Sequence, residues 1–171
     1  MATYREAENP VRQSTELEES VEGTRQFLKD IIPFDSLSEP ELTDIAVTMT
    51  WKRFSPGESI IKQGAPGENF YLIRSGLTKV YLLDDEGNET VLGFLVEADC
   101  FGEIALLTQG PTTANIQAVE QTLSLVQTKD AFLRMTHKHP VFYKFFNHLL
   151  TRRMRAVYKE LLSENPGVAH V

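Results

Sequence analysis

The sequence predicts a mostly β protein with flanking helices, whose strands form a jelly-roll-like double-stranded β-helix, or β-roll. Three observations predict this class. Between residues 49 and 128 the chain is a series of short runs rich in β-branched and aromatic residues, punctuated by Gly, Pro and Asp. No long helical pattern separates these runs, and a parallel sheet needs such crossover helices. Helical spacing of apolar residues precedes residue 49 and returns after Thr128.

Two short helices are expected before the strands. The first covers roughly residues 21–31, and Pro33 ends it because the residue before a proline is pushed out of α geometry. The second begins at Ser38, which can cap the helix together with Glu41 three residues later. Residues 1–20 are polar and lack a periodic apolar stripe, so we expect a flexible N-terminal arm.

The strand region consists of apolar runs with one clear hairpin turn. The DDEGN segment, Asp84–Asn88, supplies a glycine that can take positive φ between two of the runs. We therefore expect one domain over residues 21–165, whose roll occupies about 49–128. The runs are TWKRFS (50–55), SIIKQG (59–64), NFYLIRSG (69–76), LTKVYLL (77–83), ETVLGFL (89–95) and NIQAVEQTLSLVQT (115–128).

Two helices are expected after the strands, within about residues 129–164. A short one covers about 129–137, and a longer one starts at Pro140, where the missing N–H costs nothing, and ends at Asn165–Gly167. Its apolar stripe is wider than one side of a small roll covers, which predicts a homodimer or a partner protein docked on helix 140–163. The stripe consists of Phe142, Phe145, Phe146, Leu149, Leu150, Met154, Val157, Tyr158 and Leu161.

The charge distribution argues against nucleic acid as a partner. The formal net charge is −7, whereas proteins that bind nucleic acid need a cationic footprint. Residues 131–159 carry seven Lys or Arg and no Asp or Glu, which is either a solvated helix face or a surface for an anionic partner. Only Pro166–Val171 follow the last helix, so we expect no DNA-binding domain of the helix-turn-helix kind.

The chain has features of a protein from a reducing compartment. Its single cysteine, Cys100, cannot form an internal disulfide. No stretch approaches the roughly 18 consecutive apolar residues that span a bilayer, and the N-terminus lacks the apolar run of a secretory signal. We therefore expect a cytoplasmic protein without a membrane partner.

Residues 101–115, FGEIALLTQGPTTAN, are the most informative segment. Gly102 lets a backbone approach a ligand without a Cβ in the way. The residues from Glu103 onward can open a helical turn whose orphan N–H groups form an anion site. A glutamate beside that terminus repels a bare anion but accepts hydrogen bonds from hydroxyls, such as those of a ribose.

Four spaced motifs resemble those of the cyclic nucleotide-binding domain family, over about residues 27–160. They are FSPGESIIKQG (54–64), FYLIRSG (70–76), DCFGE (99–103) with Gly93 before it, and FGEIALL (101–107) with PTTANI (111–116). The last of them resembles the phosphate-binding cassette of the family. Members include bacterial activators that sense cAMP, kinase regulatory subunits and cyclic-nucleotide-gated channels, so the resemblance implies a regulatory sensor.

The resemblance also implies roles for individual residues. The Gly102 backbone would lie against the ribose-phosphate, and Glu103 would accept a hydrogen bond from the ribose 2′-hydroxyl. The amides of Ile104 and Ala105 would face the cyclic phosphate. On the opposite lip of the pocket the resemblance places Thr113 and Ala114.

One departure from the family pattern bears on affinity. Members that bind cyclic nucleotides usually have an arginine for the phosphate where this chain has Thr112. A charge-assisted hydrogen bond contributes about 1.5–3 kcal/mol, so its loss lowers affinity by roughly one to three decades. Backbone amides and threonine hydroxyls can still hold a phosphate, and Arg74, Arg152 or Arg153 are candidate replacement cations. The last helix also lacks the threonine that contacts adenine in cAMP-sensing activators, so base recognition must differ.

The sequence thus favours a regulatory module that binds a cyclic nucleotide such as cAMP or cGMP and signals through its C-terminal helix. The alternative is a degenerate domain that serves as an interaction or dimerisation scaffold without nucleotide. No catalytic motif is present, so neither an enzyme nor a cofactor is expected. His137 and His139, two residues apart, suit a metal poorly, and Cys100 has no histidine near it in sequence to activate it.

Overall fold

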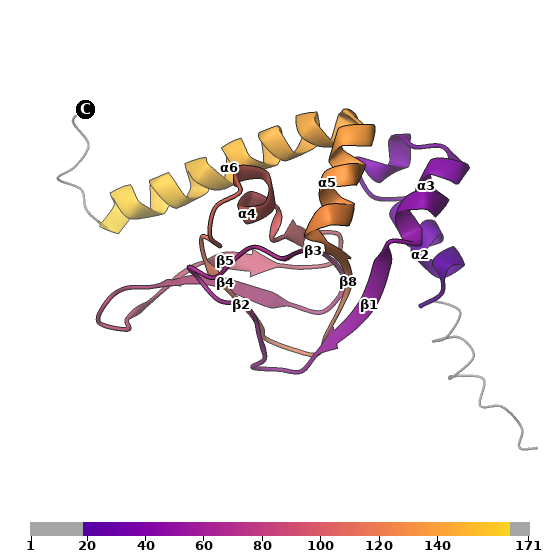
Figure 1. Ribbon diagram of the computed structural model, residues 1–171. Coiled ribbons are helices and arrows are strands. Elements are labelled where there is room, and N and C mark those ends of the chain that lie inside the picture. The colour runs from indigo at the N-terminus through magenta and orange to yellow at the C-terminus, as the bar shows by residue number, and fades with distance from the viewer. Residues whose placement is uncertain (1–18, 165–171) are drawn as a thin grey trace, which may run out of the picture. The chain divides into compact units, whose positions relative to one another are not determined.

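The computed structural model describes residues 19–164, and the chain divides between Met49 and Thr50 into two compact units. The first unit holds three short helices and the second holds the strands and the remaining helices (Figure 1). The helices of the first unit are α2 (Val21–Leu28), η1 (Phe34–Ser36) and α3 (Glu39–Ala46). The predicted arm lies almost wholly outside the described residues, and the predicted single domain over 21–165 stays a prediction.

Local signals set the ends of the helices in the first unit. The Ser20 hydroxyl accepts a hydrogen bond from the Gly23 amide at 3.1 Å, which starts α2. The helix ends at Leu28, three residues earlier than the apolar spacing predicts. The capping box of α3 is confirmed, since the Ser38 amide donates to the Glu41 carboxylate at 2.8 Å.

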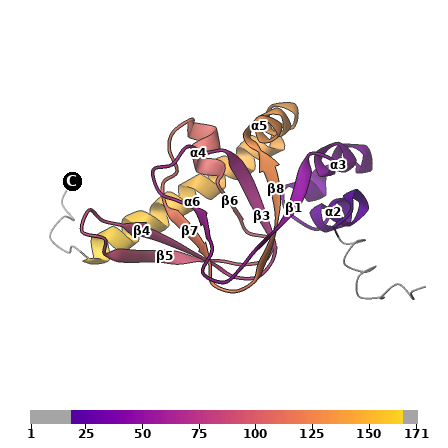
Figure 2. The same ribbon diagram turned by 60° about the horizontal axis from the view of Figure 1, so that its bottom comes forward.

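The strands of the second unit form two four-stranded sheets, ordered β1-β8-β3-β6 and β2-β7-β4-β5 (Figure 2). The ladders of β3 with β6 and β8, and of β7 with β2 and β4, are antiparallel, as is that of β4 with β5. This confirms the predicted β-roll class. The strands are β1 (Met49–Phe54), β2 (Ser59–Ile61), β3 (Asn69–Ser75), β4 (Thr78–Leu83), β5 (Glu89–Leu95), β6 (Cys100–Phe101), β7 (Asn115–Ala118) and β8 (Thr122–Thr128).

Two details of the strands differ from the sequence pattern and one turn matches it. The run over 115–128 splits into β7 and β8, and β6 is too short to produce a periodic signal. The hairpin turn between β4 and β5 is confirmed. The Asp84 amide donates to the Asn88 carbonyl at 3.1 Å, and Gly87 takes the expected positive φ of 85°.

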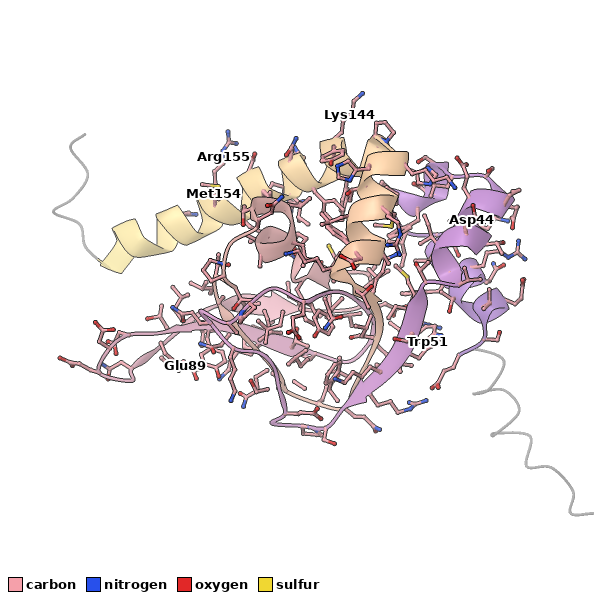
Figure 3. The ribbon with its side chains drawn as sticks, in the orientation of Figure 1. Asp44, Trp51, Glu89, Lys144, Met154 and Arg155 are labelled. Atoms are coloured by element: carbon pink, nitrogen blue, oxygen red, sulfur yellow. The ribbon has the colours of Figure 1, made fainter. Side chains whose placement is uncertain are left out.

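Helices α4 (Glu103–Thr108), α5 (Lys129–Lys138) and α6 (Val141–Glu164) complete the second unit. Phe70 on β3 stacks on Phe132 of α5 at 4.9 Å between ring centroids and meets Phe146 of α6 edge-on at 5.8 Å. The roll itself therefore buries the first turns of the apolar stripe on α6. Further along the helix Met154 is 71% exposed, and it projects outward in Figure 3. The stripe residues from Val157 onward have side chains outside the described set, so the homodimer stays a prediction.

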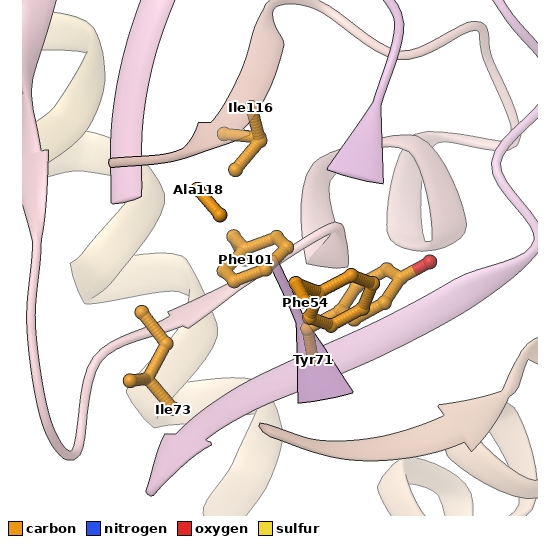
Figure 4. Packing of buried hydrophobic residues seen from close by; sticks show 6 residues of the cluster. All are labelled: Phe54, Tyr71, Ile73, Phe101, Ile116 and Ala118. Carbon is orange, nitrogen blue, oxygen red and sulfur yellow. The ribbon is translucent and has the colours of Figure 1, made fainter. Parts of the chain in front are cut away.

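The hydrophobic core of the roll is built from residues of both sheets. Successive residues of β3 point alternately into this core and toward the phenylalanines of α5 and α6. Tyr71 and Phe101 stack at 4.7 Å between ring centroids, whereas the neighbouring Phe70 points to the opposite side of β3. Figure 4 shows the cluster, which consists of Phe54, Tyr71, Ile73, Phe101, Ile116 and Ala118. Side chains on one side of β3 thus belong to the core, and those on the other side pack against α5 and α6.

Candidate functional site

Gly102 is the residue that brings α4 close to the sheet. It precedes the helix with φ of +87°, in the left-handed region that favours glycine. A Cβ at this position would lie 2.4 Å from the carbonyl oxygen of Asn69, which is a severe clash. The glycine therefore allows the first turn of α4 to lie close to β3, and the predicted approach of its backbone to a ligand stays a prediction.

A small cavity of about 70 Å³ lies along the first turn of α4. All seven residues that the sequence and the family resemblance single out for ligand binding line it, although they come from two separate segments. The predicted residues at this cavity are Gly102, Glu103, Ile104, Ala105, Thr112, Thr113 and Ala114, and strand residues Ile61, Val80 and Ile116 complete the lining.

Of the described residues that line this cavity, Glu103 is the one with a charge, and its side chain is fully buried. Its Oε1 accepts a hydrogen bond from Arg153. Its Oε2 is also buried and has no hydrogen-bond partner among residues 19–164. Burial raises the pKa of Glu103, and the Arg153 guanidinium opposes that rise. The unpartnered oxygen is an acceptor that a hydroxyl donor in the cavity would satisfy.

Arg153 connects α6 to this carboxylate. Its Nη1 donates to Glu103, and its Nη2 donates to the carbonyl oxygen of Cys100 at 2.5 Å. The guanidinium therefore bridges the end of β6 and the start of α4, and Figures 1 and 2 show α6 running past α4. Of the three candidate cations from the sequence, Arg153 is the one that reaches the site, where it pairs with the glutamate.

The other two candidate cations do not line the cavity. Arg74 donates to Glu97 at 2.8 Å. Arg152 is exposed on α6. Sequence position alone does not separate Arg152 from Arg153, because the choice depends on which side of α6 meets α4.

Thr112 has a structural use for its hydroxyl. Its Oγ1 donates to the carbonyl oxygen of Lys62 at 2.5 Å and lies 3.1 Å from that of Ala65. Its amide also donates to the Ala65 carbonyl, at 2.8 Å. Because a hydroxyl has a single hydrogen, this one holds the loop after β2 in place. The expectation that the hydroxyls of Thr112 and Thr113 help to hold a phosphate stays a prediction, and for Thr112 it would require this internal bond to break.

The structure adds residues that the sequence analysis missed. A second cavity of about 290 Å³ adjoins the first and shares Ile61, Gly102 and Thr112 with it. Its lining includes Lys62 and Tyr71. No short motif contains this set, because it comes from β2, from the following loop and from β3. Lys62 and Tyr71 lie within the sequence motifs at 54–64 and 70–76, but neither motif indicates that the two residues share a cavity.

The remaining candidate groups show no reactive arrangement. His139 is buried, with its ring 6.2 Å from that of Phe142, and no group of three His, Cys, Asp or Glu in the described range is placed to hold a metal ion. Burial raises the pKa of Cys100, and the Glu103 charge adds to that rise, so the thiolate is disfavoured. Within residues 19–164, no helix combines the length and apolarity needed to cross a bilayer.

Comparisons with known proteins give a consistent result. The sequence model described as "Cyclic nucleotide-binding domain" matches residues 51–139, more than half of the chain. A cAMP-dependent protein kinase type II regulatory subunit from Drosophila melanogaster is 31% identical over 82% of the chain. The chain spans about a third of that relative's length.

Solved structures agree with the sequence comparison. The catabolite activator protein of Thermus thermophilus is 29% identical with a TM-score of 0.66, over 75% of this chain and 60% of that one. The regulatory subunit of a cAMP-independent protein kinase A from Trypanosoma cruzi, bound to guanosine, is 26% identical with a TM-score of 0.64. That match covers 77% of this chain and 50% of the Trypanosoma chain.

Proposed function

The chain belongs to the cyclic nucleotide-binding domain family, and we propose that it is a regulatory module that holds the ribose of a cyclic nucleotide in the small cavity beside α4. The observation that carries this proposal is the buried Oε2 of Glu103, which has no partner among the described residues. An unsatisfied buried acceptor costs about 1–3 kcal/mol. A ribose hydroxyl that donates to it would recover that energy on binding.

The surrounding groups support this placement. Gly102 carries no Cβ that would obstruct the ribose, and Ile104 and Ala105 line the same cavity. Amides in the first turn of a helix have no intrahelical acceptor, so they can face a phosphate. The Trypanosoma cruzi relative bound to guanosine supports a ligand of the nucleoside and nucleotide class.

The proposed output is the position of α6. A ligand hydroxyl bound to Oε2 of Glu103 would compete for the charge that Arg153 neutralises through Oε1, so ligand binding and the seating of α6 become linked. The ligand can shift α6 only by the difference between its affinities for the two helix positions. Signalling through the C-terminal helix is thus proposed to act through the Arg153–Glu103 ion pair.

Calorimetric titration with cAMP and with cGMP tests the binding proposal. In Glu103→Gln one oxygen is replaced by an amide, and binding should weaken about 10- to 150-fold because a hydrogen bond to a charged group is lost. Glu97→Gln is the matched control, because Glu97 is an exposed glutamate that is ion-paired with Arg74. Absence of heat with cAMP, with cGMP and with the corresponding nucleosides, or equal losses in both variants, would contradict the proposal.

A second candidate function is a scaffold that binds a partner protein or a second copy without nucleotide. Thr112 at the position of the family's arginine favours it, because that residue's hydroxyl is used inside the protein. Partner binding or dimerisation through helix 140–163 that is unchanged in Glu103→Gln would support the scaffold. A cytoplasmic location and a purely regulatory, non-enzymatic role remain proposals that follow from the same family membership.

A further inference from the structure

We infer that the small cavity recognises the ribose of its ligand and not the phosphate, so the chain binds uncharged nucleosides at least as tightly as the corresponding cyclic nucleotides. This inference rests on the proposed function and narrows its ligand class. It follows from the charges, the hydrogen bonds and the burial of the residues along α4.

The lining of the cavity contains no positive charge. Among the described residues that line it there is no lysine, arginine or histidine, and Glu103 is the one ionisable side chain. Arg153 reaches that carboxylate, where its Nη1 donates one hydrogen bond to Glu103 and its Nη2 donates one to the Cys100 carbonyl. A phosphate in the cavity would therefore lie beside the Glu103 carboxylate, and the nearest guanidinium, that of Arg153, is already paired with that carboxylate.

Thr112 does not compensate for this lack of a cation. Its hydroxyl hydrogen is directed to the Lys62 and Ala65 carbonyls, and the residue is only 8% exposed. To donate to a phosphate it would have to give up the bond that anchors the loop after β2. The exposed Thr113 is then the one side-chain donor left in the lining.

The first-turn amides of α4 can donate to a phosphate, but the side chains of the cavity suit a neutral nucleoside better than a cyclic nucleotide. Its ribose presents hydroxyl donors to the buried Oε2 of Glu103, as a cyclic nucleotide does through its 2′-hydroxyl. It brings no anion that must leave water, and burying a charge without a counter-charge is expensive. A nucleoside also has a free 3′-hydroxyl, a second donor that the cyclic phosphate ester removes.

The nearby positive charge of Lys62 could favour a phosphate and so work against this preference for nucleosides. Lys62 lines the adjoining cavity, and its carbonyl accepts the Thr112 hydroxyl, so its backbone is next to the site. If its ammonium group reached the phosphate, it would replace the arginine and restore a preference for cyclic nucleotides. The experiment must therefore include a variant that removes this charge.

Titration calorimetry of the full chain with adenosine, 2′-deoxyadenosine and cAMP tests the inference. We expect adenosine to bind as tightly as cAMP or tighter, and 2′-deoxyadenosine to bind about tenfold more weakly than adenosine. Thr112→Arg should raise the affinity for cAMP about tenfold or more while that for adenosine stays within a factor of about two. Because Thr112→Arg removes the hydrogen bond to the loop after β2, thermal unfolding must show that the variant folds. If it does not fold, the ratio of the wild-type affinities for adenosine and cAMP decides the outcome.

Each remaining result has one meaning. Wild-type binding of cAMP that is reproducibly tighter than that of adenosine would overturn the inference while leaving the proposed function intact. If Lys62→Gln abolished that preference, Lys62 would be the phosphate cation. Failure of every nucleoside and nucleotide to bind would instead overturn the proposed function itself.

Discussion

Arg153 on α6 and Glu103 at the first position of α4 form an ion pair between residues fifty positions apart in the chain. The Glu103 side chain is fully buried, and that of Arg153 is 24% exposed. The pair joins the cavity to the helix whose outer surface carries Lys144, Met154 and Arg155 (Figure 3). The position of α6 and the protonation and hydrogen bonding of Glu103 are therefore physically linked.

Replacement of Arg153 by Met should destabilise the protein by about 1–3 kcal/mol, because it leaves a buried carboxylate without its partner. Urea unfolding monitored by circular dichroism measures this change. Arg155→Met is the matched control, since Arg155 is exposed on the same helix, and its effect should stay within about 0.5 kcal/mol. Equal effects of the two substitutions would show that the ion pair contributes nothing specific.

Gly102→Ala should destabilise the fold and abolish ligand binding, because the new Cβ meets the Asn69 carbonyl at 2.4 Å in addition to the strain of a positive φ. Gly87→Ala separates the two effects. Gly87 has a similar φ of 85°, but a Cβ there meets nothing within 4 Å, so its cost should be the backbone strain alone, about 1–2 kcal/mol. Thermal unfolding of both variants should show a clearly larger loss for Gly102→Ala.

The stability of the protein should depend on the ionisation of Glu103. Burial holds the pKa of Glu103 above its ordinary range, so the folded protein keeps this proton at pH values where the unfolded chain has lost it. The contribution of Glu103 to the free energy of unfolding therefore falls as pH rises from about 4.3 through the raised pKa. Urea unfolding of wild type and Glu103→Gln across this range should show wild type losing stability relative to the variant. A relative gain would mean that Arg153 outweighs burial.

Cys100 should be almost inert in the native protein. Its thiol is buried, and burial raises its pKa, with the Glu103 charge adding to the effect. Ellman's reagent should therefore react far more slowly with native protein than with protein unfolded in urea. Because Cys100 is the single cysteine of the chain, the signal needs no assignment. Rapid reaction of the native protein would show that α6 leaves the Cys100–Arg153 contact readily.

Phe146 should be among the most costly residues to truncate in the second unit. It is 1% exposed and contacts both Phe70 and Phe132, so Phe146→Ala should cost about 3–5 kcal/mol. Phe94→Ala serves as the control, because Phe94 is 55% exposed on β5 and its truncation should change the unfolding free energy little. A small effect at Phe146 would indicate that α6 is not firmly seated on the roll.

Much of the fold was predictable because its signals are local. The alternation of β3, the glycine turn at Asp84–Asn88 and the capping box at Ser38 each depend on residues a few positions apart. The two-residue β6 was not predictable, because it forms only where Leu72 and Tyr71 of β3 supply its hydrogen-bonding partners. The split of residues 115–128 into two strands is likewise decided by pairing with different sheets.

For the site, the family, the short segment around Gly102 and Glu103 and the replacement of the usual arginine by Thr112 follow from the sequence alone. The family follows from four spaced motifs, and the site residues lie within the short segment 101–116. Only the tertiary structure decided that Arg153, and not Arg74 or Arg152, meets the glutamate. It also decided that the Thr112 hydroxyl is bound to the loop after β2. Both depend on where side chains from segments about fifty residues apart point after packing, and linear spacing carries no information about that.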